Sequence, residues 1–392
     1  MTGPRQTSNH PPLPPTTEAD RLDWLRLLRS RRVGPSTFWR LLSEHGSAAE
    51  GLAALPRVAA EAGVEGYRTC PEGVVLAEIE AGARAGARLV FRGGPDYPPG
   101  LAEMEDAPPL LWACGQGALL YRPTVALVGA RNASSLGART ARLLARGLAE
   151  AGWLVVSGLA RGIDAEAHRA ALEGGAAEGD AGGTGGGTAA VMAGGVDVVY
   201  PRENARLAAE IRARGLLLSE QPMGVQPQAR HFPTRNRIVS GMARGVVVVE
   251  AAVKSGSLIT ARCALDQGRE VLAVPGHPLD GRAGGCNLLL RDGAQLVRHA
   301  EDVIEALARP EPPDLAEVIE AIPPPPPERR SRAETLALHQ RILDRLGPVP
   351  VPEDQVIRDL GGAVGQIAPA LTDLELEGRL ERRPGGLLSR PS

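Results

Sequence analysis

Short apolar runs alternate with amphipathic segments through the middle of the chain. The runs predict strands at residues 124–128, 153–157, 188–192, 216–219, 245–250 and 270–274. The segments between them predict helices at residues 135–151, 165–172 and 258–267. Strands that are apolar on both faces and alternate with helices are typical of a parallel sheet covered on both sides. The pattern therefore predicts the α/β class, with a Rossmann-like doubly wound parallel sheet.

Two shorter predicted strands precede this alternation, and we place the whole α/β domain at residues 86–309. In front of it, Leu22, Leu25 and Leu28 lie on one helical face, and a second helix is predicted to begin at Ser36. Residues 18–85 therefore predict a small helical domain of the SAM or helix-hairpin-helix type. Such modules sometimes contact the DNA backbone, and a packing or protein-contact role fits the same pattern.

The end of the chain has a different pattern. Three helical segments precede a short hairpin that carries Arg379, Arg382 and Arg383. Three helices and a basic hairpin are typical of a winged helix, which we place at residues 334–392. The proline-rich residues 310–333 before it predict a stiff linker.

Two further segments have compositions that do not favour ordered structure. Residues 1–17 are rich in proline and polar residues and lack an apolar signal core, so they predict a disordered tail. Residues 174–187 are rich in glycine and alanine and predict a flexible insertion into the α/β domain. A motif for phosphate binding is not inferred from this insertion.

Composition narrows the functional classes. Apolar residues make up 43% and charged residues 23% of the chain, as in soluble globular proteins, and no apolar run is long enough to span a bilayer. We expect a cytoplasmic protein with no membrane partner. The four cysteines are far apart in sequence, which argues against a disulfide framework and a zinc site, so we expect no metal. Aromatic residues make up only 3%, which argues against a surface that stacks many bases.

The net charge of −2 means that any basic patch must be local. Lys254 is the only lysine in the chain. A GC-rich genome that favours arginine codons explains the composition, but it does not explain why the one lysine stands in a Gly/Ser loop.

The loops that follow the predicted strands carry the candidate chemistry, because ligands of doubly wound sheets bind at the carboxyl ends of the strands. Four such loops combine glycine with Arg, Lys or Ser, the residue types that hold anions. One loop would be weak support, since strand-to-helix turns need glycine anyway, but four with matching chemistry predict a phosphate-binding track. The candidate DNA- or phosphate-binding residues are Gly129 and Arg131; Ser157, Gly158, Arg161 and Gly162; Gly194 and Gly195; and Phe232, Arg235, Asn236, Arg237, Lys254, Ser255, Gly256 and Ser257.

Two common nucleotide sites are disfavoured. The dinucleotide fingerprint GxGxxG is not completed after Gly129, and the second strand ends in Ser157-Gly158 rather than in an acid that would hold a ribose. The P-loop motif GxxxxGK[ST] is absent, because the only lysine follows Val253. We therefore expect no cofactor. No set of nucleophile, base and acid is evident either, so we expect no enzyme.

Several polar residues near these loops have a structural alternative. Asp164 is expected to cap the helix that follows it, and His168 to be packed or capping. Asp197 is expected to orient a neighbouring arginine. For Arg235 and Arg237, pairing with Glu220 and Glu250 competes with DNA binding. We favour one structural arginine and one binding arginine.

Two other side chains of the fourth loop are assigned to binding. Phe232 is one of three phenylalanines and is suited to stack on a base. Lys254 stands beside the amides that open the next helix, so we expect it to contact a phosphate.

Several motifs resemble those of the DNA-processing protein A family of bacteria, also called DprA or Smf. The matching segments are 125–131, 157–168, 194–197, 232–241, 254–261, 267–276 and 287–293, and the resemblance extends to the N-terminal helices and the winged helix. The insertion at 174–187 departs from the family pattern.

The resemblance implies a protein without enzymatic activity that binds incoming single-stranded DNA during natural transformation and protects it. It further implies help in loading the recombinase RecA and a homodimer formed through the Rossmann-like domain. The family pattern places phosphate contacts at Gly129, Arg131, the 157–162 loop, Gly194-Gly195, Arg235 and Lys254.

Two alternatives remain. A nucleotide-processing enzyme related to the phosphoribohydrolases would share the fold, but the segment Gly185-Gly-Gly-Thr188 lacks the glutamate of their PGGxGTxxE motif. A transcription regulator would use the winged helix to read duplex DNA.

Overall fold

The computed structural model describes residues 14–175, 186–308, 332–347, 349–361, 364–383 and 386–391. The chain divides into two compact units, residues 1–309 and 310–392, and each is described by itself. Three predicted segments lie largely outside the described residues. They are the tail up to residue 13, the insertion at residues 176–185 and the linker at residues 310–331.

The first unit begins with four helices: α1 (Glu18–Arg29), α2 (Pro35–His45), α3 (Ala48–Glu61) and α4 (Glu72–Arg84). Thr17 and Asp20 form a capping box that begins α1, whereas Gly34 begins α2 with no side-chain cap. The aromatic rings of Trp24 and Phe38 meet edge to face, with centroids 5.1 Å apart. The core of these helices also includes Phe91 and Leu110, so they pack directly onto the first strands of the sheet.

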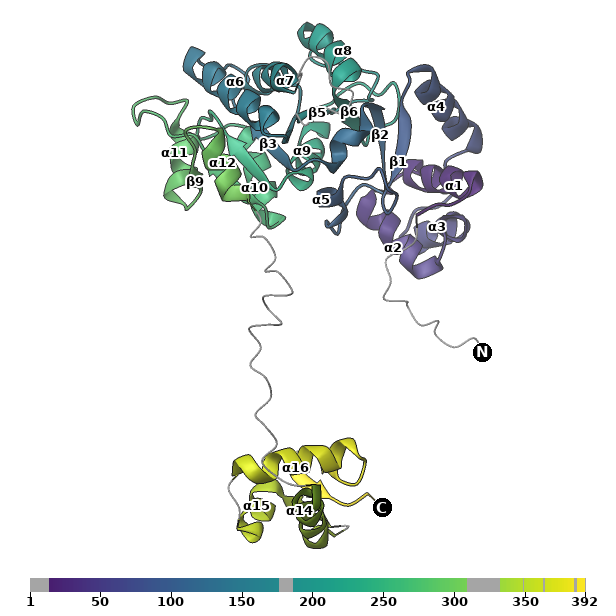
Figure 1. Ribbon diagram of the computed structural model, residues 1–392. Helices are drawn as coiled ribbons and strands as arrows, with labels where there is room; N and C mark the ends of the chain where they lie inside the picture. The colour runs from purple at the N-terminus through teal and green to yellow at the C-terminus, as the bar shows by residue number, and fades with distance from the viewer. Residues whose placement is uncertain are drawn as a thin grey trace. The chain divides into compact units, whose positions relative to one another are not determined.

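A nine-stranded sheet forms the centre of this unit (Figure 1). Its strands in chain order are β1 (Arg88–Phe91), β2 (Leu110–Gly115), β3 (Thr124–Val128), β4 (Leu154–Ser157), β5 (Gly187–Val191), β6 (Leu216–Ser219), β7 (Gly245–Val248), β8 (Glu270–Ala273) and β9 (Gln295–Leu296). Their order across the sheet is β1-β2-β6-β5-β4-β3-β7-β8-β9. The strands from β6 to β9 are parallel, and β2 and β1 extend one edge antiparallel.

This order confirms the predicted doubly wound sheet. From β3 the chain builds outward through β4, β5 and β6, and then returns to build β7, β8 and β9 on the other side. The order therefore reverses between β3 and β7, and in open α/β sheets the ligand crevice lies at this switch point, beyond the carboxyl ends of the strands.

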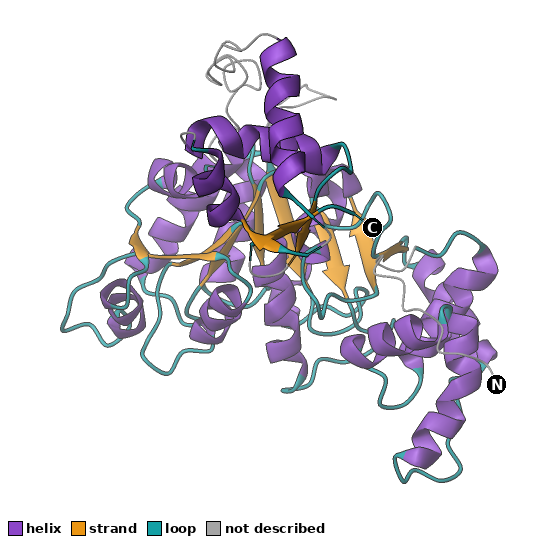
Figure 2. Ribbon diagram, turned by 90° about the horizontal axis from the view of Figure 1, so that it is seen from below, coloured by secondary structure: helices purple, strands orange, loops and turns teal. Residues whose placement is uncertain are grey.

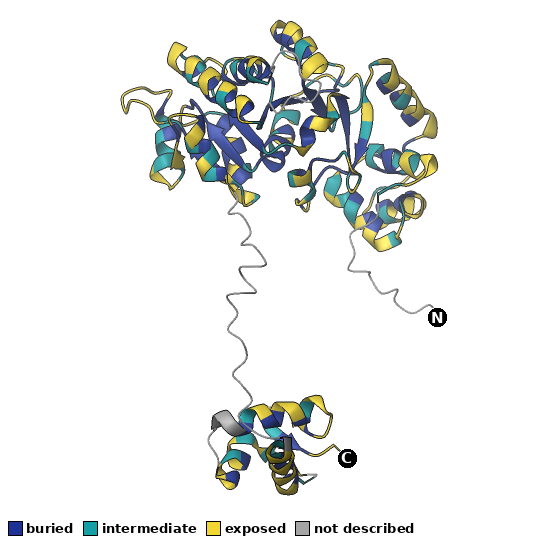
Figure 3. Cartoon of the chain, in the orientation of Figure 1, coloured by how far each residue is buried: buried dark blue, intermediate teal, exposed yellow. Residues whose placement is uncertain are grey.

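Helices cover both faces of the sheet (Figure 2). One face is covered by α6 (Ser135–Glu150), α7 (Ile163–Gly174), α8 (Ala205–Arg214) and α12 (Ala300–Leu307). The other is covered by α5 (Pro99–Ala102), α9 (His231–Met242), α10 (Ser257–Asp266) and α11 (Gly284–Arg291). Two short 3-10 turns, η1 (Gly117–Tyr121) and η2 (Arg202–Asn204), complete the unit. The strands are buried between these layers, as burial on both faces requires of apolar runs (Figure 3).

The main correction to the sequence prediction is α9. The segment from Arg230 to Arg237 was expected to be part of a loop, but it opens a helix that runs to Met242. Pro233 stands in the first turn of this helix, where a missing N–H leaves no hydrogen bond unmade. Arg235 and Arg237 are therefore two residues apart on a helix and face different sides of it.

The second unit confirms the predicted winged helix. It contains α14 (Arg332–Arg345), α15 (Glu353–Leu360) and α16 (Val364–Leu376). A three-stranded antiparallel sheet of β10 (Val351–Pro352), β12 (Leu387–Ser389) and β11 (Glu381–Arg383) completes it. In the described parts of both units, no helix is both long and apolar enough to cross a membrane.

Candidate nucleic-acid interface

A trough of about 690 Å³ opens at the switch point between β3 and β7. Its walls come from the loops after β3, β4 and β7 and from the first turns of α9 and α10. A smaller pocket of about 230 Å³ adjoins it, and Arg131, Gly158, Ala160 and Phe232 line both. Residues from the first, second and fourth predicted loops thus meet at the trough, and the third loop contributes to the smaller pocket.

The first loop presents free backbone amides. The Ala130 N–H donates to the backbone oxygen of Glu250 (2.7 Å), and the Ser134 N–H donates to the Glu250 carboxylate (3.0 Å). Between these two anchors, the amides of Arg131, Asn132 and Ala133 have no acceptor among the described residues. Glu250 therefore fixes the two ends of the loop and leaves its middle available to an anion.

Gly129 is required at this position for packing. A Cβ there would lie 2.6 Å from the Ile163 Cγ1 and 3.0 Å from the Glu250 backbone oxygen. Its role in the structure is to let the loop after β3 approach the start of α7. Arg131, two residues further, is exposed at the junction of the two pockets.

The second loop is held from below by buried polar groups. Ser157 is fully buried and donates its hydroxyl to the Leu127 backbone oxygen (2.6 Å), so its side chain is not exposed to a ligand. The Asp164 carboxylate accepts from the amides of Gly158 (3.1 Å) and Ala160 (3.3 Å). The expectation that Asp164 caps its own helix was wrong, because it holds the preceding loop instead. The Gly158 amide is thereby committed, whereas the amides of Arg161 and Gly162 have no acceptor among the described residues.

His168 supports the same loop. Its Nε2 accepts from the Leu159 N–H (3.3 Å), and its Nδ1 lies 2.6 Å from the Thr188 hydroxyl. That hydroxyl donates its only proton to the Val155 backbone oxygen (2.8 Å), so it can only accept from His168. The ring proton of His168 is therefore on Nδ1. Burial lowers the pKa of His168 to about 3. His168 is thus a neutral packed histidine, as the sequence suggested.

The third loop is mainly structural. Gly194 and Gly195 are buried, and the Gly195 N–H donates to the Val225 backbone oxygen (2.9 Å). Asp197 accepts from the Gly224 N–H (2.9 Å), so it orients a backbone segment rather than an arginine as expected. Of the glycine pair, only Gly194 lines the smaller pocket.

Helix α9 separates the two arginines that the sequence could not separate. Arg237 donates to the Glu220 carboxylate (2.6 Å) and the Asp106 backbone oxygen (2.8 Å), on the side away from the trough. Arg237 therefore serves the fold, and its assignment as a DNA contact is corrected. Arg235 and Asn236 line the trough. Of the two arginines, Arg237 is structural, and Arg235 is the one available to a ligand in the trough.

Arg235 is a buried guanidinium with unused donors. It is 6% exposed, its Nη1 donates to the Val191 backbone oxygen (3.1 Å), and its Nε has no partner among the described residues. It lies against Gly158, where a Cβ would come 1.4 Å from Nη1. Burial lowers its pKa, and nearby Asp164 opposes that shift without coming within ion-pair distance. A buried arginine with no ion-paired carboxylate is well suited to an anionic ligand.

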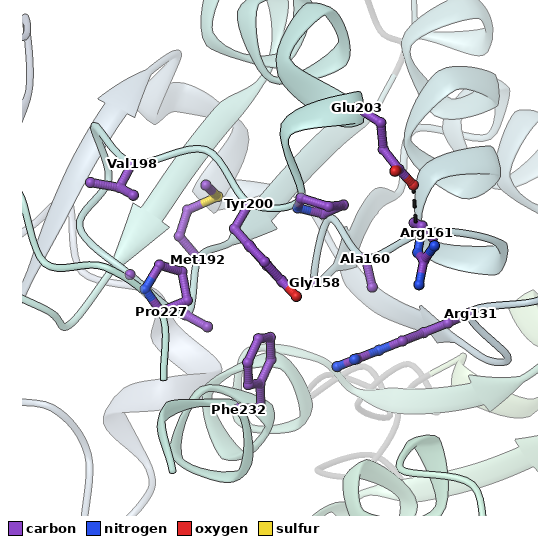
Figure 4. Close-up of a pocket in the computed structure, with 13 residues that line it drawn as sticks. Arg131, Gly158, Ala160, Arg161, Met192, Val198, Tyr200, Glu203, Pro227 and Phe232 are labelled. Atoms are coloured by element: carbon purple, nitrogen blue, oxygen red, sulfur yellow. Dashed lines mark ion pairs between the residues drawn. The ribbon is translucent and has the colours of Figure 1, made fainter. Parts of the chain in front are cut away.

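Three side chains contact one another in the smaller pocket (Figure 4). The Arg131 guanidinium carbon lies 5.1 Å from the centroid of the Phe232 ring, and the Phe232 and Tyr200 rings meet edge to face at 5.9 Å. Arg161 extends on the other side of the pocket and pairs with Glu203 at 3.5 Å. Because both partners of this pair are exposed, the pair is weak and exchangeable.

The start of α10 completes the trough. Lys254 is exposed and has no carboxylate within 4.0 Å among the described residues. The hydroxyls of Ser255 and Ser257 lie 2.7 Å apart, and the Gly256 amide has no acceptor among the described residues. A free amide at a helix N-terminus beside a free lysine favours an anion.

Among the lining residues that sequence reasoning missed, two have side chains suited to bind a nucleotide chain. Arg282, from the loop after β8, lines the trough, and Tyr200, from the loop after β5, lines the smaller pocket. The rule of strand-end loops applies to both loops, and Arg282 stands in the glycine-rich segment Gly281-Arg-Ala-Gly-Gly285, so its signal was present in the sequence. Tyr200 has no such signature. No group of three or more His, Cys, Asp or Glu within the described residues is arranged to hold a metal ion.

The winged-helix unit carries its basic side chains on its first two helices and around its hairpin. Its third helix, α16, contains no lysine or arginine. The arginines of the predicted basic hairpin are engaged by glutamates of the same unit. The pairs are Arg379–Glu377, Arg382–Glu375, Arg382–Glu353 and Arg383–Glu381.

The fold and the trough define a Rossmann-like protein with a cationic, amide-rich site at its switch point. The chain belongs to the DNA recombination-mediator protein A family, whose model matches residues 88–308. The models for the DprA-like N-terminal HHH domain and the DprA winged helix domain match residues 18–81 and 323–386.

Proteins from several bacteria are similar to this chain. Protein Smf of Escherichia coli is 39% identical over 303 residues, which cover 74% of this chain and 74% of that protein. The X-ray structure of DNA processing protein A from Streptococcus pneumoniae, at 36% identity, covers 74% of this chain and 99% of that chain with a TM-score of 0.60. The structure of DNA processing protein A from Helicobacter pylori, described for its single-stranded DNA binding mode, covers 56% and 95% at 28% identity and a TM-score of 0.49.

Proposed function

We propose that this protein binds single-stranded DNA along the trough, protects it, and passes it to the recombinase RecA during natural transformation. One observation carries the proposal. The loops after β3 and β7 bring free amides to one crevice that also holds Arg235 and Lys254, neither of which has a carboxylate partner among the described residues. Phosphodiester groups are anions with several acceptor oxygens, and they match such a donor set.

The smaller pocket favours a single strand over a duplex. The pocket offers the rings of Phe232 and Tyr200 and the guanidinium of Arg131 to a base that is not stacked in a helix. A duplex keeps its base faces covered and would use only the phosphate donors. The pocket of about 230 Å³ suits one base at a time, in keeping with the few aromatics of the chain.

The recombinase and homodimer parts of the proposal have separate support. The family description as a recombination mediator supports delivery of the strand to RecA. The homodimer is supported by the sheet edge at β9, where both Gln295 and Leu296 are exposed, Leu296 at 49%. An exposed edge strand with an apolar side chain is a ready surface for pairing with a second copy. We expect Leu296→Glu to shift the protein toward monomer in light scattering.

The proposal contains no chemical step. For a phosphoribohydrolase-like enzyme, the Gly-Gly-Thr segment would have to face substrate, yet the Thr188 hydroxyl is buried between Val155 and His168. For a transcription regulator, the third helix of the winged-helix unit would need basic side chains to meet duplex DNA, and α16 contains no lysine or arginine. Neither alternative gains support from these positions.

Binding of single- and double-stranded DNA of mixed sequence, measured by fluorescence anisotropy, tests the proposal. We expect tighter binding of the single strand, weakened by Lys254→Ala for every sequence. Arg146→Ala is the matched control, because Arg146 is an exposed arginine near the carboxyl end of α6, at the opposite edge of the sheet. Equal binding of both DNA forms, or a Lys254→Ala variant that binds like the control, would contradict the proposal.

A further inference from the structure

A second groove, of about 500 Å³, lies between the N-terminal helices and the loop that leads into α9. One wall is the turn between α1 and α2, and the other is formed by the segment after β6 and by Arg230. The groove does not belong to the trough, since the two sets of lining residues share no member.

The groove has two cations without a carboxylate partner among the described residues, although the Arg230 Nε donates to the His231 Nε2 (3.4 Å). Of its charged lining residues, Arg29 is bound by Glu78 through two contacts of 2.8 and 2.9 Å. Glu220 is bound by Arg237 at 2.6 Å. Arg32 and Arg230 then remain, and neither has a carboxylate within 4.0 Å among the described residues. Glu220, the only acidic residue that lines the groove, is thus paired with an arginine outside it, and the groove keeps an excess of positive charge.

The turn between α1 and α2 adds backbone donors. Arg32 has a left-handed backbone (φ 64°), and Gly34 begins α2 with no side-chain cap. The amide of Gly34, which lines the groove, and the amides of Ser36 and Thr37, which follow it in the first turn, have no acceptor among the described residues, and that turn contains no acidic residue. The partial positive charge of the helix N-terminus is therefore not offset locally.

The first turn of α9 lies between the groove and the trough. Arg230, which immediately precedes α9, lines the groove, and Phe232 lines both pockets of the trough. The two residues face different sides of the helix and are separated by a rise of about 3 Å along its axis. A strand that passes around this end of α9 would therefore contact both sites.

We propose that this groove is a second phosphate-binding subsite, where Arg32, Arg230 and the first turn of α2 hold the backbone of single-stranded DNA after it leaves the trough. The inference rests on the proposed function and extends it from the α/β domain to the helical domain. It assigns a ligand class to a surface for which the sequence left two roles open. The sugar-phosphate backbone is the expected contact, because the groove is lined by no aromatic side chain.

A length series of oligonucleotides tests the subsite. A strand of about 4 nucleotides should fill only the trough, whereas one of about 16 should reach the groove. The double variant Arg32→Gln/Arg230→Gln should bind the short strand like wild type. Two lost phosphate contacts should weaken binding of the long strand about 25-fold at 0.1 M salt and flatten its salt slope by about 1.4. Arg31→Gln is the matched control, since Arg31 is an exposed neighbour that does not line the groove.

A second variant separates binding from folding. Ser36→Asp places a carboxylate in the first turn of α2, which should raise helix stability while repelling a phosphate. We expect an unchanged or higher melting temperature together with weaker binding of the long strand only. Long-strand affinity equal to wild type in both variants, with Lys254→Ala still weakening both lengths, would overturn the subsite and leave the trough intact. A wild-type protein that binds neither length would overturn the trough as well.

Discussion

The position of Arg235 can be tested without changing the charge of the protein. In the structure its guanidinium lies against Gly158, where there is no side chain. The substitution Gly158→Ala would place a Cβ 1.4 Å from the Arg235 Nη1, so the arginine must leave this site. The variant keeps every charged residue and loses only the placement of one of them.

The expected magnitude follows from the cations of the trough. Four line it: Arg131, Arg235, Lys254 and Arg282. If each neutralises one phosphate, the salt slope of single-strand binding is about −2.8, and raising salt from 50 to 200 mM weakens binding about 50-fold. Displacing one cation reduces the slope to about −2.1 and the loss to about 20-fold.

The assay is fluorescence anisotropy of an oligonucleotide of about 6 nucleotides, titrated at several salt concentrations. Arg235→Gln should give the same reduced slope as Gly158→Ala, and the double variant should lose nothing more, because both substitutions remove one contact. A Gly158→Ala variant that folds normally and keeps the wild-type slope would refute the reasoning, since binding would then depend on net charge and not on the placement of Arg235.

Three further predictions concern the supports of the trough and the wing. Lowering the pH from 7 to 5 should reduce the free energy of unfolding by about 2 kcal/mol through His168. The pKa of His168 is about 3 in the folded protein and 6.5 when the side chain is exposed. Its contribution to stability is therefore complete above pH 6.5 and is lost as the pH falls toward 3. Urea unfolding of wild type and His168→Gln checks this, and equal pH slopes in the two proteins would contradict it. Gly162→Ala should cost at least about 1–3 kcal/mol in the same assay, because Gly162 has a φ of +72° and a Cβ would lie 2.2 Å from the Ala130 backbone oxygen; an unchanged unfolding midpoint would count against it. Arg382→Ala should leave single-strand affinity within twofold of wild type, since glutamates already occupy that arginine, and a tenfold loss would show that the wing binds DNA.

The strands from β3 to β8 were predictable from sequence because burial on both faces of a parallel sheet leaves a clear signal, whereas the strand order that sets the switch point came from the structure. The run Thr124–Val128 is predicted and observed with the same bounds, since every residue in it is buried. Helix α9 was not predicted, because its first turn contains Pro233 and polar residues and its apolar residues come late. Without the helix, the opposite orientations of Arg235 and Arg237 had no basis in the sequence.

The roles of the buried polar residues were harder to predict because their partners are distant in sequence. Ser157 looks like a loop donor, yet its hydroxyl is bonded to Leu127, thirty positions earlier. Asp164 stands where a capping residue is expected, but the loop before it curls back over its carboxylate. Sequence motifs indicate which residue types belong to a site. Only the hydrogen bonds between distant parts of the chain show which of these residues hold the loops in place and which are available to a ligand.

This division explains how a chain with a net charge of −2 can hold a polyanion. Two buried acids are bonded to backbone amides around the trough: Glu250 binds the ends of the first loop, and Asp164 binds the second loop. Glu250 leaves the amides in the middle of the first loop free to face the trough. The negative charge of Asp164 is offset by the two amides that it accepts from and by nearby Arg235. The local field then comes from oriented backbone dipoles and a few placed cations, not from net charge.

Such a site should bind strongly at short range and attract DNA only weakly from a distance, so we expect the salt dependence of binding to appear in the dissociation rate more than in the association rate. Stopped-flow measurements at several salt concentrations test this, and an association rate that carries most of the salt slope would mean that a larger basic surface steers the strand.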